Sequence, residues 1–235
     1  MNTLNEELTE NLKRNGASLV GFADLSDLPV EARDGFGYGI SIAVMLNPEI
    51  VMMIAKGPSI EYYNEYNRVN RLLNQLAEHG AEILKASGFD ALAKTQSIVK
   101  QDEKTKRTKL PHKTIATKAG LGWIGKCALM ITEKYGAAIR ITSVLTNARL
   151  DTGTPIVDSR CGKCDDCKII CPAGAVTGKS WKAGMDRDDF FKALDCSAKI
   201  HERGRDLGLT GGTCGLCIWA CPWTQKHLKK EKVLS

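Results

Sequence analysis

The spacing of the cysteines constrains this chain more than any other feature. Eight of its nine cysteines lie in the last third of the 235 residues, in two motifs that each end in Cys-Pro. The first is Cys161-x2-Cys164-x2-Cys167-x3-Cys171-Pro172, and the second, with its first member displaced, is Cys196-x17-Cys214-x2-Cys217-x3-Cys221-Pro222. The first run is the ligand spacing of bacterial-type [4Fe–4S] proteins. The sequence therefore predicts two [4Fe–4S] clusters.

The same spacing predicts how the eight thiolates are shared. Two-residue gaps let one tight loop supply three thiolates to a cubane, and in two-cluster proteins the Cys before Pro ligates the other cluster. We therefore expect each motif to give three ligands to one cluster and one to its neighbour. The first set is Cys161, Cys164, Cys167 and Cys221, and the second is Cys171, Cys196, Cys214 and Cys217.

Other uses of clustered cysteines fit less well. Structural zinc takes one four-ligand site with a different spacing, and a thioredoxin-like redox pair needs a single C-x-x-C. Disulfides are rare in the reducing cytosol. The ninth cysteine, Cys127, has two open interpretations: a small buried apolar residue, or a reactive or ligating thiol.

The composition is that of an ordinary globular chain, with 43% hydrophobic and 26% charged residues. The first ten residues lack the basic and apolar regions of a signal peptide, and no apolar stretch reaches the roughly 18 residues of a membrane span. We expect a cytoplasmic protein with no membrane partner. The net charge of +6 allows an acidic redox protein as partner without requiring one.

Hydrophobic periodicity predicts an α+β arrangement before the cysteine motifs. Helices are expected over 6–15, 59–86 and 111–118, and strands over 18–22, 38–46, 90–93, 127–132 and 137–145, with a turn at 133–136 joining the last two. Residues 100–109 read as a charged loop. The composition changes near residue 150, so we place a domain boundary there, giving domains 1–150 and 151–235.

A glycine-rich segment, Gly120-Leu-Gly-Trp-Ile-Gly-Lys126, matches G-x-G-x-x-G. A dinucleotide fingerprint must follow a strand and open a helix, but here a helix is expected before the segment and a strand after it. The segment also nearly matches a phosphate-binding loop, but Cys127 replaces the hydroxyl residue that holds Mg²⁺. We expect these glycines to allow close backbone approach to a flat ligand or to the clusters instead.

The stretch AGLGWIGKCALMIT, residues 119–132, together with the two cysteine motifs, the second of which ends in Cys221-Pro222-Trp223, resembles the epoxyqueuosine reductase family. These enzymes are cobalamin-dependent and related to reductive dehalogenases. The resemblance implies a nitroreductase-like, corrinoid-binding α+β domain followed by a ferredoxin-like two-cluster module. It also implies that the clusters reduce a cobalamin, whose tentative contacts in this chain are Gly120, Gly122, Trp123, Gly125 and Lys126.

Two departures from the family pattern affect the expected activity. The family's catalytic Asp lies in an Asp-Ser-Ala-Pro-like segment, and the matching region here, residues 104–109, is basic. His112 is a tentative substitute as proton donor, since imidazole titrates near neutrality. The chain ends at Ser235 without the family's tRNA-binding repeats. We therefore do not expect action on queuosine in tRNA, or a nucleic-acid partner.

Three hypotheses of function follow. The first is a corrinoid-dependent iron–sulfur oxidoreductase acting on an unknown substrate. The second is an electron-transfer protein that reduces a corrinoid or metal centre of a partner. The third keeps the nitroreductase-like fold with a bound flavin. In each, a ferredoxin or flavodoxin is the expected redox partner, with the basic stretch 100–118 as a docking face and the terminal lysines 226–232 as a solvated end.

Overall fold

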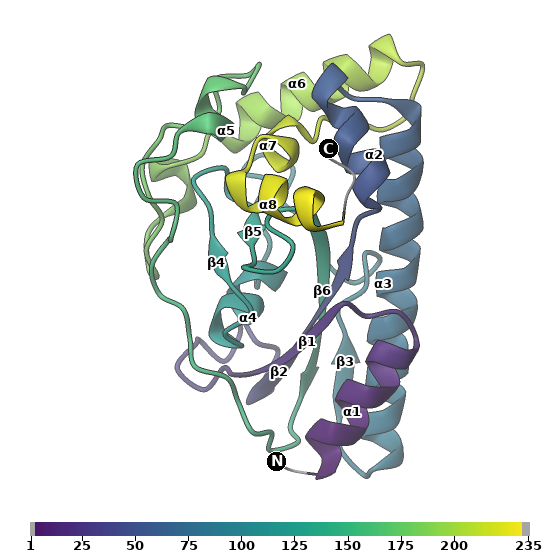
Figure 1. Cartoon of the computed structure of the whole chain (residues 1–235). Coiled ribbons are helices and arrows are strands. Elements are labelled where there is room, and N and C mark those ends of the chain that lie inside the picture. The colour runs from purple at the N-terminus through teal and green to yellow at the C-terminus, as the bar shows by residue number, and fades with distance from the viewer. Residues whose placement is uncertain (1–2, 232–235) are drawn as a thin grey trace. The chain divides into compact units, whose positions relative to one another are not determined.

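The computed structural model describes residues 3–231, which form an α+β fold (Figure 1). No helix in this described part is long and apolar enough to cross a membrane. The helices and short 3-10 helices are α1 (Thr3–Arg14), α2 (Pro48–Met53), η1 (Ile54–Lys56), α3 (Ile60–Ala86), α4 (His112–Lys118), α5 (Asp166–Ile169), η2 (Arg187–Asp189), α6 (Ala193–Asp206), α7 (Leu216–Trp219) and α8 (Pro222–Lys230). The strands are β1 (Leu19–Asp24), β2 (Tyr38–Met45), β3 (Ala91–Ala93), β4 (Trp123–Ile124), β5 (Met130–Ile131) and β6 (Ile139–Thr146).

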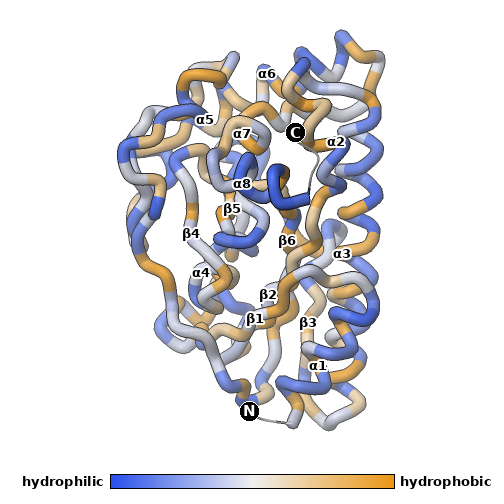
Figure 2. Tube along the Cα trace, in the orientation of Figure 1, coloured by the Kyte–Doolittle hydropathy of each residue, from blue (hydrophilic) through white to orange (hydrophobic). Residues whose placement is uncertain are grey.

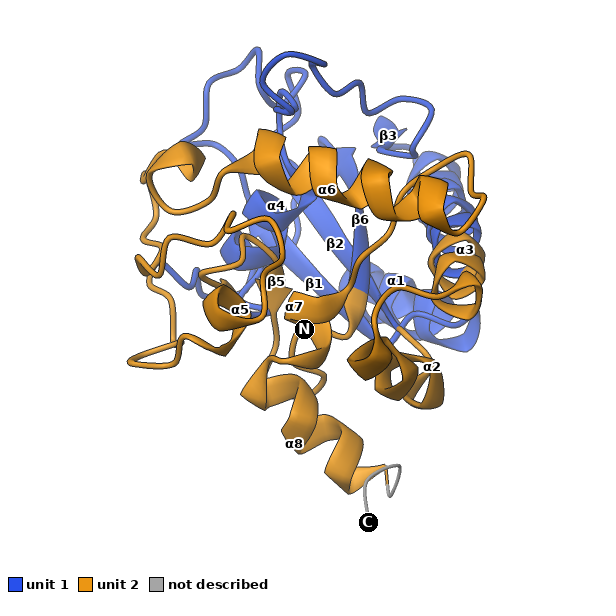
Figure 3. Ribbon diagram, turned by 90° about the horizontal axis from the view of Figure 1, so that it is seen from above, with its two compact units in different colours: residues 1–45, 69–122, 140–157 blue, residues 46–68, 123–139, 158–235 orange. Residues whose placement is uncertain are grey.

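The chain divides into two compact units that alternate along the sequence (Figure 3). Unit 1 holds the residues up to 45, then 69–122 and 140–157. Unit 2 holds 46–68, 123–139 and the residues from 158 onward. The domain boundary expected at residue 150 stays a prediction. The two compact units do not divide the chain at one point, because each consists of three separate segments.

Unit 1 is built on a four-stranded sheet with the order β1-β2-β6-β3. β1 and β2 pair antiparallel, with Leu19 opposite Ala43, and β3 pairs antiparallel with β6. Figure 2 shows hydrophobic residues running along these strands, while hydrophilic and hydrophobic residues alternate along α3. α1 contacts β1, and α4 contacts β1 and β2. The amphipathic helices therefore cover apolar strands, as a sheet core requires.

The longer predicted elements of unit 1 are confirmed. The helix expected over 59–86 is α3, and the strands expected over 38–46 and 137–145 are β2 and β6 within two residues. The turn expected at 133–136 is present and is closed by an antiparallel bridge between Thr132 and Gly136. The strand expected over 127–132 is shorter than predicted, because only Met130 and Ile131 pair, with Ile124 and Trp123. A turn at residues 125–129, with Ala128 at φ 59°, makes this pairing possible.

Unit 2 consists mainly of short helices around the cysteine loops. α7 contacts α2, η1, α5 and α8, so it lies at the centre of these helices. Its N-cap is Gly215, with φ 72°, where a Cβ atom would lie 2.7 Å from the ring of Tyr62. α8 begins at Pro222, directly after Cys221. Pro at the first helical position suits its fixed φ and its missing N–H.

The turn before β6 packs closely against the first turn of α8. A Cβ atom on Gly136 would lie 2.2 Å from the backbone nitrogen of Thr224. The backbone N–H of Ala137 donates to Oγ1 of Thr224 at 2.9 Å. Only glycine allows this close approach, so the turn at 133–136 fixes the first turn of α8 and with it the position of Cys221.

Candidate iron–sulfur centre

Four cysteines from both motifs line one cavity in unit 2. The cavity has a volume of about 220 Å³, and its lining includes Cys161, Cys164, Cys167 and Cys221. Burial raises the pKa of Cys221, and the nearby Cys161 raises it further. These four cysteines are the set expected from the crossed pairing. The structure therefore brings Cys221 to the loop of the first motif.

The second set also converges. Cys196 lies on α6, and its pKa is raised to about 11 by burial and by the neighbouring Cys171 and Cys214. These three residues belong to the second predicted set. The fourth member, Cys217, lies on α7. α7 contacts α5, which carries Cys167 of the first set, so the two sets lie close within unit 2.

Several hydrogen-bond donors point at the cysteine sulfurs or lack any acceptor. The backbone N–H of Ala175 donates to Sγ of Cys171 at 3.4 Å, and Nη1 of Arg203 donates to Sγ of Cys214 at 3.9 Å. The indole nitrogens of Trp123 and Trp219 are buried and have no acceptor in the described part of the chain. Hydrogen bonds to cluster and ligand sulfurs tune reduction potentials. Such donors fit a site for sulfur-rich clusters.

Cys127 lies beside both sets of cysteines. It lines the same cavity as the first set, and its side chain is only 3% exposed. A hydrogen bond with Cys167 lowers its pKa, but a hydrogen bond with Cys217 and burial raise it well above the usual value. Cys127 is therefore a protonated thiol between a member of each set, and a donor or packing role suits it better than a reactive thiolate.

Comparison with known proteins agrees with this geometry. Residues 160–224 match the family described as the 4Fe-4S double cluster binding domain. Epoxyqueuosine reductase of Escherichia coli K12 is 32% identical over 115 residues, which is 48% of this chain and 30% of that protein. The enzyme of Listeria monocytogenes is 37% identical over 119 residues, covering 48% and 29%. Over about half of its length the chain is similar to epoxyqueuosine reductases, and residues 160–224 match a 4Fe-4S double cluster binding domain.

Several solved structures share the fold of this chain over nearly its whole length. Epoxyqueuosine reductase from Bacillus subtilis has a TM-score of 0.63 at 18% identity, covering 96% of this chain and 67% of that one. A catabolic reductive dehalogenase in complex with 3-bromo-4-hydroxybenzoic acid has a TM-score of 0.69 at 17% identity, covering 95% and 33%. A further structure, of a reductive dehalogenase that suggests a mechanism for B12-dependent dehalogenation, has a TM-score of 0.67. The sequence alignments to the curated relatives span about 30% of their length.

The glycine-rich segment packs closely against other parts of the chain. Cβ atoms on Gly120 and Gly125 would lie 2.7 Å from the carbonyl oxygen of Thr154 and 2.9 Å from Ile131. Gly122 is buried. Trp123 is fully buried, with its ring centroid 5.1 Å from that of Trp223 in an edge-to-face pair. The segment is preceded by α4 and contains β4 (Trp123–Ile124), whereas a dinucleotide fingerprint follows a strand and opens a helix.

Lys126, the last of the five tentative corrinoid contacts, reaches the first cysteine loop. Its Nζ donates to the carbonyl oxygen of Cys164 at 2.8 Å and to the carboxylate of Asp165 at 2.9 Å. Its side chain is 6% exposed. The ammonium group holds the pKa of Asp165 below its usual value. These contacts tie the glycine-rich segment to the cysteine loop, and the corrinoid contacts stay a prediction.

His112 lies in unit 1, at the start of α4. Its Nδ1 is 2.6 Å from Oγ of Ser143. Burial, with the positive charges of Lys94 and Arg140, lowers its pKa to about 4. The imidazole is therefore neutral at physiological pH. The role of His112 as a proton donor stays a prediction. The donated proton would be the single N–H proton of the neutral ring.

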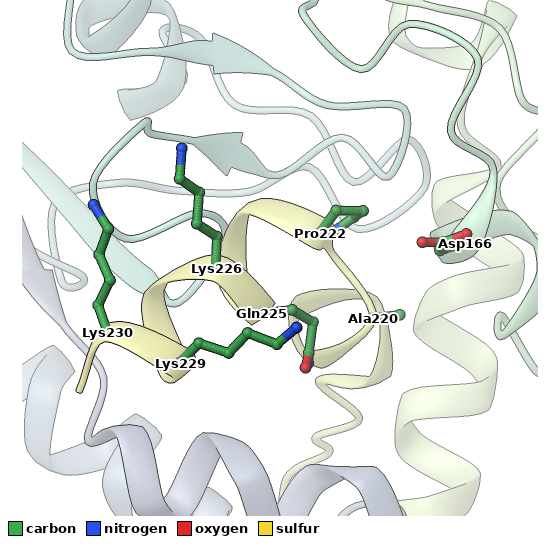
Figure 4. A pocket seen from close by; sticks show the side chains of 7 residues that line it. All are labelled: Asp166, Ala220, Pro222, Gln225, Lys226, Lys229 and Lys230. Atoms are coloured by element: carbon green, nitrogen blue, oxygen red, sulfur yellow. The ribbon is translucent and has the colours of Figure 1, made fainter. Parts of the chain in front are cut away.

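A basic recess of about 580 Å³ opens beside the first cysteine set. Figure 4 shows Lys226, Lys229 and Lys230 extending from α8, which begins at Pro222, while Asp166 lies across from them on α5. Pro222 adjoins Cys221, and Asp166 adjoins Cys167. Nζ of Lys226 lies 5.5 Å from the ring centroid of Trp223, whose side chain lines the cysteine cavity. The terminal lysines therefore line a recess next to two expected ligands in sequence, Cys221 and Cys167.

Sequence reasoning missed Asp165, Arg203 and the recess on α8. An Asp between two motif cysteines and an Arg seven residues after Cys196 carry no signal in the sequence alone. The lysines of α8 do recur at i, i+3 and i+4, a spacing that places them on one helical face. That face could have been predicted once a helix was expected after Cys221.

Proposed function

We propose that this chain is an iron–sulfur oxidoreductase that passes electrons through two [4Fe–4S] clusters to a corrinoid bound at the N-terminal domain, for reduction of an unidentified substrate. The observation that carries the proposal is the convergence of Cys161, Cys164, Cys167 and Cys221 on one cavity. Relatives described as epoxyqueuosine reductases and reductive dehalogenases support the reductive direction.

The residues around the cysteines have defined tasks in this proposal. Eight thiolates hold the clusters, which supply one-electron transfer when bound. Lys126 fixes the first cysteine loop through Cys164 and Asp165. Arg203 and the N–H of Ala175 donate to ligand sulfurs of the second set. Trp223 lines the cysteine cavity and packs edge to face with Trp123, so the two rings supply apolar surface that keeps water away, and low solvent exposure tunes the potential.

The corrinoid half of the proposal rests on the relatives alone. Of the five residues expected to contact it, Gly120, Trp123, Gly125 and Lys126 make close contacts within the chain, and their role toward a corrinoid stays a prediction. We therefore assign no contact or step to a corrinoid. A site elsewhere in the chain, or on another protein, remains part of the proposal to be tested.

The alternative is an electron-transfer protein that reduces the corrinoid or metal centre of a partner. The basic recess on α8 favours it, because a charged surface beside Cys221 and Cys167 suits a docking face for an acidic redox protein. Lys229 and Lys230 have no carboxylate partner among the described residues. By contrast, Lys109 and Lys118 of the stretch 100–118 are paired with Asp34 and Asp27.

The deciding experiment is anaerobic EPR of the cluster-loaded chain titrated with cob(II)alamin. A corrinoid enzyme gives a protein-bound cobalt signal with a changed axial ligand that saturates at one cobalamin per chain. An electron carrier leaves the signal of free cobalamin unchanged beside intact signals of the reduced clusters. Absence of any cluster signal after anaerobic reconstitution would reject both versions.

Stopped-flow reduction by a reduced acidic flavodoxin tests the docking face. Replacing Lys226, Lys229 and Lys230 with Gln should slow the second-order rate about 10-fold at low salt and flatten its dependence on ionic strength. The matched control replaces Lys100, Lys104 and Lys106, which removes the same charge from the other basic stretch. A greater loss in the control would move the docking face there.

A further inference from the structure

A second cavity, within unit 1, has the chemistry of an anion site. Its volume is about 340 Å³, within the size range of small-molecule pockets. α3, α4, β6 and the loop after β3 contribute its walls, and none of the described residues that line it is acidic. Three of them can carry positive charge: Lys94, His112 and Arg140.

An unsatisfied donor lies in the wall of this cavity. Asn70 is 5% exposed, and its Oδ1 accepts a hydrogen bond from Nε of Arg140 at 2.9 Å. Because the acceptor end of the amide faces Arg140, its orientation is fixed. The other end, Nδ2, is buried and has no partner among the described residues. A buried donor without an acceptor is unfavourable, so this N–H group indicates a missing acceptor.

Lys94, one of the cations of the cavity, shares its carboxylate partner with a second lysine. Lys94 is 6% exposed, and its Nζ lies 3.1 Å from Oδ2 of Asp34. The same carboxylate also accepts from Lys109 at 2.6 Å, so one negative charge serves two ammonium groups. The lowered pKa of His112 has Lys94 and Arg140 among its causes, which agrees with a positive potential in this cavity.

We propose that this cavity binds the oxyanion of a small molecule, a carboxylate or a phosphate, with Nδ2 of Asn70, Lys94 and Arg140 as its donors. Asn70 supplies a neutral N–H donor, and the two cations supply charge. Glutamine and threonine side chains around them, Gln96, Gln101, Thr108 and Thr142, offer further polar contacts. The inference needs neither the clusters nor the proposed reaction.

The anion has two possible sources, a free metabolite or the phosphodiester of a corrinoid nucleotide loop. Cobalamin carries this phosphodiester and cobinamide lacks it. With inorganic phosphate as the competing probe, displacement by cobalamin but not by cobinamide assigns the site to the corrinoid tail. Phosphate binding that neither corrinoid displaces assigns it to a free small molecule. Both results support an oxyanion site.

The test measures phosphate binding to the cluster-loaded chain by calorimetry at constant ionic strength. Asn70→Asp keeps an acceptor for Arg140, removes the free N–H donors and adds a negative charge. It should weaken phosphate binding at least 10-fold. Gln75→Glu makes the same amide-to-carboxylate change at an exposed position of α3 and should bind like the parent chain.

Two results would overturn the proposal. One is a parent chain that binds no phosphate in the millimolar range, and the other is equal binding by the parent and Asn70→Asp. Should Asn70→Asp fail to fold, Arg140→Gln repeats the test at a partly exposed position. In that variant, too, undiminished phosphate binding rejects the site.

Discussion

The ammonium nitrogen of Lys126 lies 2.9 Å from the carboxylate of Asp165 and 2.8 Å from the carbonyl oxygen of Cys164. Lys126 follows β4, whereas Asp165 lies between two cysteines of the first motif. The link therefore joins segments almost forty positions apart in sequence. It fixes the loop that presents Cys161, Cys164 and Cys167.

Replacing Lys126 with Met should destabilise this loop. The change keeps the apolar stem but leaves the Cys164 carbonyl and Asp165 without their donor. Because Asp165 is 41% exposed, we expect a modest loss of about 1–3 kcal/mol in the free energy of unfolding. Iron content after reconstitution should fall as well. Lys163→Met, at an exposed position of the same loop, should change neither quantity.

Double variants test the crossed sharing of cysteines. If Cys161 and Cys221 ligate the same cluster, replacing both with Ala removes one cluster, and iron falls from about eight to about four atoms per chain. Replacing Cys161 and Cys171 then removes a ligand from each cluster and affects both EPR signals. The opposite pattern would mean that each motif holds its own cluster. Cys127→Ala should retain both clusters.

Arg203 should raise the reduction potential of the second cluster. A guanidinium 3.9 Å from Sγ of Cys214 stabilises the added electron. Arg203→Gln should therefore lower that potential by roughly 20–60 mV, about 0.5–1.4 kcal/mol for one electron. EPR-monitored redox titration measures the change. Arg205→Gln removes an exposed charge from the same helix, and an equal shift there would show that only net charge matters.

His112 should make stability depend on pH. Its pKa in the folded chain is about 4, below the value near 6.5 of an unfolded histidine, so the unfolded chain binds more protons between these values. Stability is therefore full above pH 6.5 and falls as the pH drops toward 4. Between pH 7 and 5 the loss is roughly 1–2 kcal/mol.

Urea unfolding at pH 7 and pH 5 measures this effect. His112→Gln removes the titrating group and should reduce the pH-dependent loss by that amount, while His201→Gln, at an exposed position, should retain it. An unchanged difference between the two pH values in His112→Gln would contradict the assigned pKa and its cause, the burial of His112 near Lys94 and Arg140.

The sequence by itself determined the features that depend on local spacing. Cysteine gaps predicted the cluster motifs, and periodicity predicted α3, β2 and β6, because a long amphipathic helix and apolar strands are set by the order of their own residues. The helix expected before the glycines likewise argued against a dinucleotide fingerprint, which must follow a strand.

Tertiary structure decided what depends on contacts between distant residues. It set the pairing of β5 with β4 and the link from Lys126 to Asp165. It also placed Asn70 and Arg140 on one cavity wall from α3 and β6. Burial and hydrogen-bond partners arise only when such segments meet, so no local pattern in the sequence could reveal them.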